Sequence, residues 1–317
     1  YAIYKKTGQV TFNLNGNTSF NYNGSSYTAT KTFNLCTMYN TATSCTASVT
    51  MPTITAPANT PTVIGWSNSA TNRTATYTSG QTGVTLTSGS TWYAQTRKNA
   101  VTLTASFNAN GATLSSTASQ SCTLATTYNG TAQATSCTVT APTITRSGYT
   151  IDGFNTSASS TSNNSAYNAS TKKITLNSSL NNKTWYAITH KNVTATFYYY
   201  SSGVKNTKAS CPMYNKAPTC SITVPTSTFS STTSQYGASY VGYGAVNTMG
   251  TSTATSATIS ANTSYYVSYR KSVTEYYQNK SRTVYRNAFF TSSSAMSTVL
   301  STSTTGITNL SGASYTS

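Results

Sequence analysis

The chain has 317 residues, with 19 Lys and Arg, two acids and one His, and its formal net charge is +17. Ser and Thr supply 118 of these residues, and Tyr supplies 25. So few His, Asp and Glu side chains argue against acid–base catalysis and against a calcium or zinc site, which need them in groups. We therefore expect no enzyme activity, no metal and no cofactor.

The composition favours β structure. Thr, Tyr and Val suit a pleated strand, while the helix-favouring residues Glu, Lys and Leu are scarce. No stretch has the apolar spacing of an amphipathic helix, and no apolar run approaches the ~20 residues that span a bilayer. We predict a mainly β protein with no membrane insertion in this segment.

One pattern recurs three times along the chain. Each copy opens with a strand of alternating apolar residues, and the first two openings end in Asn-Gly turns, at residues 15–16 and 110–111. Each copy holds a Gly–aromatic pair in its middle and closes on an aromatic strand. The closing sequences are Thr-Trp-Tyr-Ala at 91–94 and 184–187 and Ser-Tyr-Tyr-Val at 264–267, and Tyr-Ala-Ile-Tyr at 1–4 resembles them.

These landmarks predict a tandem array of small β modules. The predicted boundaries are 1–8 for the end of a preceding module, 9–98, 99–191 and 192–271 for three repeats, and 272–317 for a divergent, incomplete module. The three full copies are termed repeat 1, repeat 2 and repeat 3. We expect the chain to be a segment of something longer.

Six cysteines fall into local pairs, one in each repeat: Cys36 with Cys45, Cys122 with Cys137 and Cys211 with Cys220. Their spacing is wider than that of a zinc knuckle, and no clustered histidines accompany them. We predict three local disulfides, each contributing roughly 2.5 to 3 kcal/mol in the loop-entropy model, and hence an oxidising, extracellular location. Six reduced, buried cysteines are the alternative.

The basic residues form small groups rather than one long run. Four groups lie at or just past a closing sequence, at 5–6, 97–98, 190–191 and 270–271. This recurring position suits a junction between modules better than a nucleic-acid groove, and no nucleic-acid-binding motif is present. We expect no specific nucleic-acid partner.

A serine could join Asp152 and His190 in a catalytic triad. Serine is so frequent in this chain that the coincidence carries no weight. The simpler interpretation places Asp152 in a turn and gives His190 the strand-end position that Arg97 holds in repeat 1.

Two runs of tyrosine are candidate interaction residues, since neighbouring side chains on a strand point to opposite faces. They predict packing between modules or, as the alternative, a stripe that binds sugar or protein. The residues are Tyr198, Tyr199, Tyr200, Tyr276 and Tyr277.

Three stretches of repeat 2 carry a family pattern: Phe-Asn-Ala-Asn-Gly at 107–111, Pro-Thr-Ile-Thr-Arg-Ser-Gly-Tyr-Thr-Ile-Asp-Gly-Phe at 142–154 and Thr-Trp-Tyr-Ala at 184–187. They resemble the Listeria–Bacteroides repeat, the B-repeat of internalin-like bacterial surface proteins. Repeats 1 and 3 match it more loosely, and the cysteine pair and greater length depart from it. The resemblance implies small β-grasp-like or β-sandwich-like modules strung as a stalk, with no catalytic residues to carry over.

These patterns favour a non-enzymatic structural segment, a stalk, of a secreted or wall-anchored bacterial surface protein or adhesin. The expected partners are neighbouring modules or other copies of the chain, with a host or cell-wall glycan or protein as a further candidate. Two alternatives remain: a subunit of a self-assembling extracellular filament or pilus-like fibre, and an accessory binding module of a secreted enzyme. The expected location is extracellular, at the cell surface.

Overall fold

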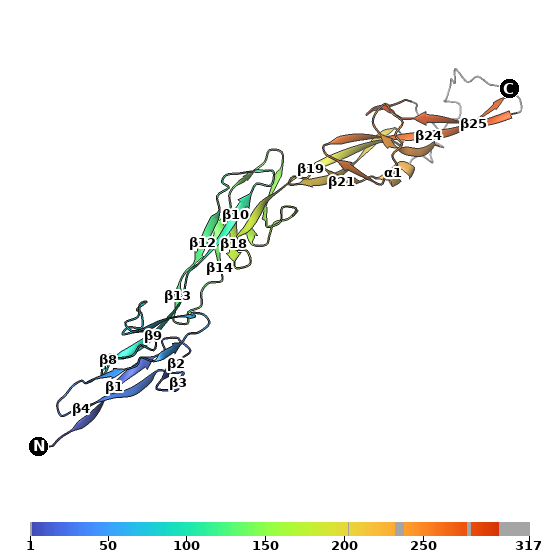
Figure 1. Ribbon diagram of the computed structural model, residues 1–317. Coiled ribbons are helices and arrows are strands. Elements are labelled where there is room, and N and C mark those ends of the chain that lie inside the picture. The colour runs from blue at the N-terminus through green and yellow to red at the C-terminus, as the bar shows by residue number, and fades with distance from the viewer. Residues whose placement is uncertain (1, 202, 232–237, 278–279, 298–317) are drawn as a thin grey trace. The chain divides into compact units, whose positions relative to one another are not determined.

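The computed structural model describes residues 2–201, 203–231, 238–277 and 280–297, with side chains except at 231, 272–284 and 286. Regular structure in these residues is almost entirely β-strand (Figure 1), so the mainly β prediction is confirmed. No helix among them is long and apolar enough to cross a membrane. The chain divides into two compact units: unit 1 comprises Tyr1–Phe107, Ser116–Pro142 and Ser165–Trp185, and unit 2 comprises Asn108–Ser115, Thr143–Asn164 and Tyr186–Ser317.

The strands of unit 1 are short and closely spaced in sequence. They are β1 (Lys5–Asn13), β2 (Ser19–Tyr22), β3 (Ser25–Tyr27), β4 (Lys31–Tyr39), β5 (Thr46–Val49), β6 (Thr53–Thr55), β7 (Thr62–Ser67), β8 (Val84–Thr87), β9 (Thr91–Lys98), β10 (Val101–Asn108), β12 (Gln120–Leu124), β13 (Thr127–Tyr128), β14 (Ser136–Thr140), β17 (Tyr167–Asn168) and β18 (Lys173–Asn177).

Unit 2 contains longer strands and the one described helix. Its elements are β11 (Thr113–Leu114), β15 (Ile144–Thr145), β16 (Thr150–Asn155), β19 (Lys183–Tyr200, which begins in unit 1), β20 (Val204–Tyr214), β21 (Cys220–Thr223), α1 (Thr226–Ser231), β22 (Ala238–Gly244), β23 (Ser256–Ile259), β24 (Thr263–Tyr277), β25 (Lys280–Ala288), β26 (Phe290–Ser292) and β27 (Ala295–Met296).

The main sheet of unit 1 includes the strand order β4-β1-β9-β7, and the two central strands run parallel. Strand β1 pairs antiparallel with β4, and β9 pairs antiparallel with β7. The parallel register sets Phe12 opposite Trp92, so an opening and a closing strand lie side by side. Much of β1 alternates between buried and exposed residues, as expected for a sheet with one covered face.

Unit 2 contains the same order, β20-β19-β24-β22, around a parallel central pair. Phe197 lies opposite Tyr265 there, in the register that Phe12 and Trp92 have in unit 1. The outer strands β20 and β22 are again antiparallel to their neighbours. The recurrence of the opening and closing sequences in repeats 1 and 3 therefore has a matching strand arrangement.

The glycine of each Gly–aromatic pair lies at a bulge. The register shifts occur between Val63 and Gly65 in β7, Ile151 and Gly153 in β16, and Tyr240 and Gly242 in β22. Gly65 has a φ of 137°, and a side chain there would meet the carbonyl oxygen of Tyr77. The bulge aims the next residue inward, so the Trp66 and Phe154 rings are fully buried.

Aromatic rings form the core of repeat 1. Phe12 contacts Trp66 and Phe20 edge-on, with ring centroids 5.1 and 6.1 Å apart, and all three rings are fully buried. The indole Nε1 of Trp66 donates a hydrogen bond to the carbonyl oxygen of Pro52 at 2.7 Å, which satisfies its polar atom. In unit 2, Phe197 and Tyr243 meet edge-on at 5.6 Å.

Removing the central ring should open a large cavity in this core. We predict that Trp66→Ala lowers the free energy of unfolding of unit 1 by roughly 3 to 5 kcal/mol. Amide hydrogen exchange at increasing denaturant measures this, because it reports each unit separately. Val63→Ala in the same strand is the control, since Val63 is 37% exposed, and its cost should stay below about 1 kcal/mol. Equal costs would contradict a core centred on Trp66.

Candidate junction site

The three predicted disulfides are present, and all six cysteines are paired. Each has a Cα–Cα distance of 6.0 to 6.1 Å, which suits a disulfide. The pairs are those predicted from the sequence, Cys36 with Cys45, Cys122 with Cys137 and Cys211 with Cys220. The alternative of six reduced, buried cysteines is therefore wrong.

Each disulfide joins two neighbouring segments of its own repeat. In repeat 2, Cys122 lies in β12 opposite Leu103, and Cys137 lies in β14 opposite Leu176. The bond between Cys122 and Cys137 therefore ties together two strands that belong to different sheets.

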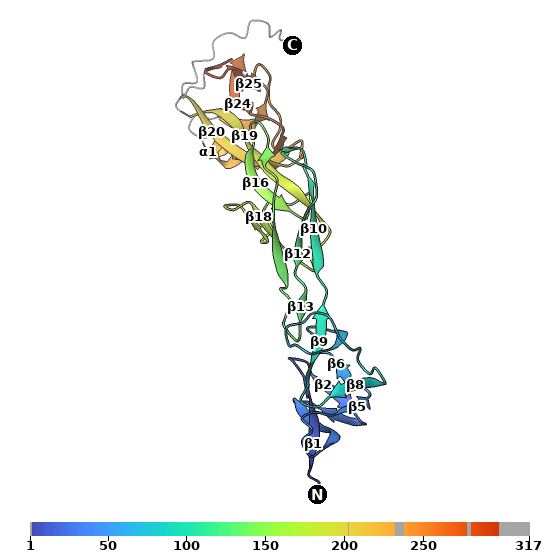
Figure 2. The same cartoon turned by 90° about the vertical axis from the view of Figure 1, so that its left-hand side faces the viewer.

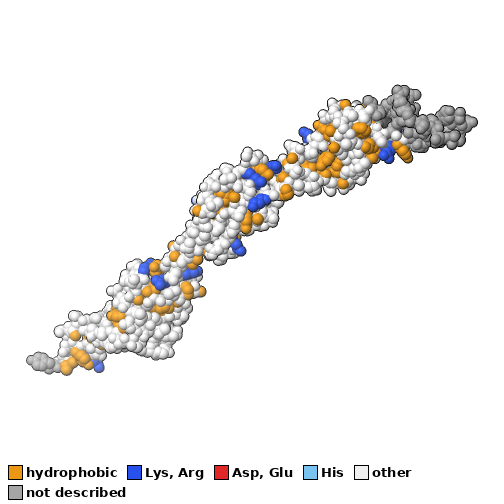
Figure 3. Space-filling view, turned by 45° about the horizontal axis from the view of Figure 1, so that its top comes forward, with side chains coloured by type: hydrophobic (Ala, Val, Ile, Leu, Met, Phe, Trp, Pro, Cys, Tyr) orange, Lys and Arg blue, Asp and Glu red, His pale blue; other side chains and the backbone are white. Residues whose placement is uncertain are grey.

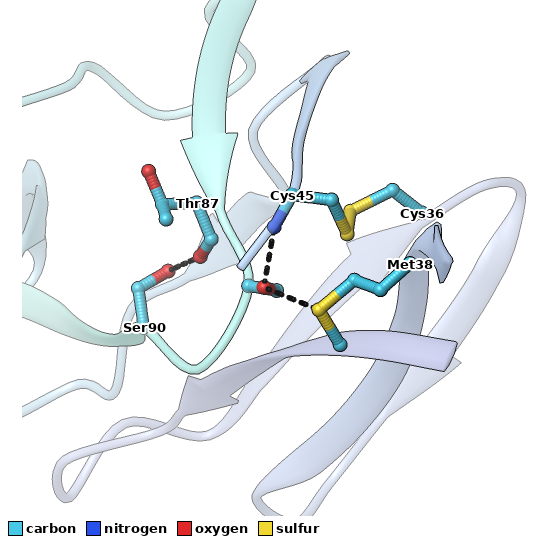
Figure 4. The surroundings of a disulfide bond; sticks show 6 residues. Cys36, Met38, Cys45, Thr87 and Ser90 are labelled. Carbon is cyan, nitrogen blue, oxygen red and sulfur yellow. Dashed lines mark hydrogen bonds between the residues drawn. A yellow bond between two sulfur atoms is a disulfide. The ribbon is translucent and has the colours of Figure 1, made fainter. Parts of the chain in front are cut away.

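The first disulfide packs directly on the opening strand of repeat 1. The Cys45 N–H donates to the Ser88 hydroxyl at 3.0 Å. Figure 4 shows this disulfide between Cys36 and Cys45. Gly8 faces Cys36 across the sheet, and a Cβ at Gly8 would lie only 2.5 Å from the Cys45 sulfur. The absence of a side chain at Gly8 makes room for this bond.

Each disulfide closes a loop that carries a Tyr-Asn pair in its middle, here termed a tip. The tips are Tyr39-Asn40, Tyr128-Asn129 and Tyr214-Asn215. Met precedes the Tyr-Asn pair in the first and third loops and Thr precedes it in the second, while the residue that follows it is Thr, Gly and Lys in turn. The disulfide limits the freedom of the tip by joining the two ends of its loop.

Each tip asparagine makes the same two hydrogen bonds to one residue further back in the chain, an arrangement here termed the clasp. In the first clasp, which joins repeats 1 and 2, the Asn129 N–H donates to the Thr96 carbonyl at 3.1 Å, and the Thr96 N–H donates to Asn129 Oδ1 at 3.0 Å. In the second clasp, which joins repeats 2 and 3, Asn215 and Thr189 make the equivalent bonds at 2.7 and 3.1 Å. Asn40 and Tyr4 make them at 2.8 and 3.3 Å.

The backbone conformation explains why the residue is asparagine. Asn40, Asn129 and Asn215 have φ values of 50°, 50° and 53°, in the left-handed region that asparagine tolerates better than most residues. A left-handed residue turns the chain away from the neighbouring strand, so its own carbonyl no longer continues the ladder. The side-chain amide oxygen then accepts the strand N–H in its place.

Three of the four basic groups noted in the sequence lie beside these tips. In the strand registers, Lys5 faces Tyr39, Arg97 faces Tyr128 and His190 faces Tyr214, whereas the fourth group has no tip opposite it. The guanidinium of Arg73 lies over the Tyr128 ring at 4.5 Å, and the His190 ring lies 5.3 Å from that of Tyr214. These three basic groups therefore have a structural position in common. In Figure 3, Lys and Arg side chains are scattered in separate groups over the visible face.

A second asparagine holds the same edge of the closing strand, the edge opposite the Gly–aromatic strand. Asn15 Nδ2 donates to the Ala94 carbonyl at 3.2 Å, and Asn110 Nδ2 donates to the Ala187 carbonyl at 3.1 Å. Both residues belong to the Asn-Gly turns of the openings and have φ values of 50° and 48°. The closing strands of repeats 1 and 2 are thus each bonded by the turn of their own repeat and by the tip that follows.

The two turns that meet at the first clasp touch through their backbones. A Cβ on Gly130 would meet the carbonyl oxygen of Gly16, and a Cβ on Gly16 would meet that of Asn129. In unit 2 the tip continues with Lys216 instead of glycine, and a Cβ on Gly111 would lie 3.1 Å from its Cγ atom. The second clasp therefore accommodates a side chain that the first excludes. Figure 2 gives a second view of β1 and β13, the strands that precede these turns.

The first clasp is backed by a buried network of neutral groups. Thr60, Thr96 and Asn17 are 0%, 0% and 7% exposed. The Thr60 hydroxyl accepts from the Gly130 N–H at 2.9 Å and is hydrogen-bonded to the Thr96 hydroxyl at 2.9 Å, and Thr96 in turn donates to Asn17 Oδ1. Every buried polar group named here has a partner, as a stable interior requires.

The second clasp uses a cation in the same place. Arg146 Nη1 donates to the Thr189 hydroxyl at 2.8 Å and to the Asn215 carbonyl at 2.5 Å. Its guanidinium lies 3.6 Å from the centre of the Tyr149 ring. One arginine thus replaces the threonine network while keeping the clasp geometry.

Asp152 and His190 lie together, with 2.7 Å between Oδ2 and Nδ1. Asp152 is inside β16, so its predicted place in a turn is wrong, whereas His190 does hold the strand position of Arg97. Among the described residues, no serine or threonine hydroxyl bonds the imidazole, and no three His, Cys, Asp or Glu side chains gather as metal ligands. The pair lies beside the second clasp.

The predicted interaction tyrosines pack inside unit 2. Tyr198 stacks on Tyr266 at 5.2 Å with an interplanar angle of 11°, and Tyr199 contacts Phe229 at 5.9 Å. The Tyr200 N–H donates to the Tyr269 hydroxyl at 3.0 Å. The side chains of Tyr276 and Tyr277 lie outside the described residues.

No family model, curated protein or solved structure matches this chain. The resemblance to the Listeria–Bacteroides repeat therefore stays a prediction. Sequence reasoning noted the cysteine pairs but missed the tips, although each pair encloses one Tyr-Asn. That recurring dipeptide was the available signal.

Two glycines offer a matched test of the backbone contact at the first clasp. Gly24 and Gly130 have φ values of 79° and 77°, but a Cβ at Gly24 meets nothing within 4 Å. Alanine at either position carries the left-handed strain of about 1 to 2 kcal/mol. We predict that Gly130→Ala costs at least about 1 kcal/mol more than Gly24→Ala, because only Gly130 meets another backbone. Denaturant unfolding measures both, and equal costs would contradict the contact.

Proposed function

We propose that this chain is a structural spacer, a tandem array of modules that holds other parts of an extracellular protein at a fixed separation. The observation that carries the proposal is the recurrence of one clasp, with the same two hydrogen bonds, at successive repeats. Hydrogen bonds that recur while the surrounding side chains change support a structural role rather than a catalytic one. A stalk of a bacterial surface protein or adhesin is the form that the sequence resemblance favours.

We also propose that the modules are β-grasp-like. In both units a parallel central pair is flanked by antiparallel outer strands, in an order that brings the first and last strands of a module together. The family resemblance likewise implies a β-grasp-like module. The cysteine loop is the addition that links one module to the previous one.

The connections between repeats suit a spacer because each is short and consists of two links, the continuing chain and the clasp. Only residues 99 and 100 separate β9 from β10, and the end of repeat 2 continues into repeat 3 within the single strand β19. A single strand alone could swivel. The clasp supplies a second connection beside it, and two connections oppose both bending and twisting.

The three disulfides support an oxidising location outside the cytoplasm. Each links two cysteines that are 9 or 15 residues apart in the sequence. Closing a loop of that length should add roughly 2.5 to 3 kcal/mol to the free energy of unfolding. Two of the three loops bear tips that are packed on a preceding repeat. The disulfides would therefore stabilise junctions as well as repeats.

Pulsed electron paramagnetic resonance tests this proposal within unit 1. Spin labels carried on non-canonical amino acids would replace the exposed Ser26 of repeat 1 and the exposed Thr123 of repeat 2. We predict a narrow distance distribution in the parent chain. In the double variant that combines Cys122→Ser with Cys137→Ser, the loop of the packed tip is freed, and the distribution should become at least about twice as wide.

The double variant that combines Cys36→Ser with Cys45→Ser is the matched control. It removes a disulfide of the same kind, but its loop bears the tip that does not join repeats 1 and 2, so the distribution should stay narrow. A parent chain as broad as the variant that lacks the bond between Cys122 and Cys137 would contradict the spacer proposal.

A further inference from the structure

One of the three clasps is uncovered. Ile3 and Tyr4 are 75% and 73% exposed, and Tyr39 of the adjoining tip is 56% exposed. At the other two clasps the positions of Ile3 and Tyr4 are held by Gln95 and Thr96 and by Ile188 and Thr189. All four of these residues are 0% exposed.

The covered clasps show what is missing. Thr96 is flanked by Val63 of β7, and Thr189 by Ile151 of β16, so a Gly–aromatic strand pairs with each closing strand. The Asn-Gly turn of the same repeat bonds the alanine two positions earlier. Neither element lies on residues 2–4 in the described part of the chain, although Tyr4 already has both clasp bonds to Asn40.

The uncovered tip is of the repeat 3 type. Asn40 follows Cys36 by four positions and Asn215 follows Cys211 by four, whereas Asn129 follows Cys122 by seven. The next residue is Thr41 in the first tip and Lys216 in the third, but Gly130 in the second. The close backbone contact made by Gly130 leaves no space for a side chain at that position.

We propose that the face formed by Ile3, Tyr4, Tyr39 and Asn40 is a docking surface for a further repeat of the repeat 2 type, joined ahead of residues 1–4 in the same polypeptide. Such a repeat would take residues 1–4 as its closing strand. Its Asn-Gly turn would face Thr41 as Gly111 faces Lys216, and an arginine at the position of Arg146 would bond the Asn40 carbonyl. The inference rests on the proposed tandem array and adds which repeat fits this end of it.

Fusion of a second copy of residues 99–185 directly ahead of Tyr1 tests the docking surface in the full chain. The join recreates the Trp185-Tyr186 sequence of repeat 2. We predict that exchange of the Tyr4 amide slows at least about tenfold relative to the unfused chain, and that the Tyr39 ring becomes inaccessible to a solvent quencher. Asn40→Ala in the fusion should restore fast exchange.

A second copy of residues 9–92 fused at the same place is the matched control, because its turn at Gly16 fits a glycine tip. It should protect the Tyr4 amide less than the 99–185 fusion does. Unchanged exposure of Tyr4 and Tyr39, equal protection by both fusions, or a fused repeat that does not fold would each overturn the inference. Burial of this face by self-association of the unfused chain would also overturn it, since the occupant would then be a second copy. None of these results alters the distance distribution across the first clasp, so the spacer proposal is tested separately.

Discussion

The structure of each junction depends on one backbone constraint, an asparagine held in the left-handed conformation at the end of a strand. Its φ of about 50° turns the chain away, and its side-chain oxygen replaces the carbonyl that the turn removes from the ladder. The disulfide, the tyrosine before it and the basic residue opposite that tyrosine all surround this residue. Without the clasp, a tip would be an exposed loop with no fixed position on the preceding strand.

The clasp stays the same while the residues behind it change. Thr60 and Asn17 support the first, and Arg146 supports the second, with Asp152 and His190 alongside. Backbone bonds need only a conformation, so side chains can vary as long as each buried polar group keeps a partner. In the proposed array, the differences between tips, glycine in one and lysine in another, would set which repeat fits which tip.

The sequence predicted the mainly β class and the three disulfides, because each has a local pattern, and it singled out the Gly–aromatic pairs without predicting their bulges. It could not predict the pairing of Asp152 with His190, which depends on the register of β16 against β19. The clasp was missed for the same reason, since Thr96 and Asn129 are 33 residues apart and meet only in the fold. The tyrosines at 198–200 contact rings of their own unit, whereas the sequence had suggested packing between modules or a binding stripe.

Amide hydrogen exchange at Thr96 and Thr189 tests the clasp most directly. Asn129→Ala should speed exchange at Thr96 and leave Thr189 unchanged, and Asn215→Ala should do the reverse. Asn23→Ala, at another left-handed position in an exposed turn, controls for the backbone strain that alanine introduces and should affect neither amide. If both amides keep their protection in all three variants, the side-chain oxygens do not hold the strands, and the account of the junctions is wrong.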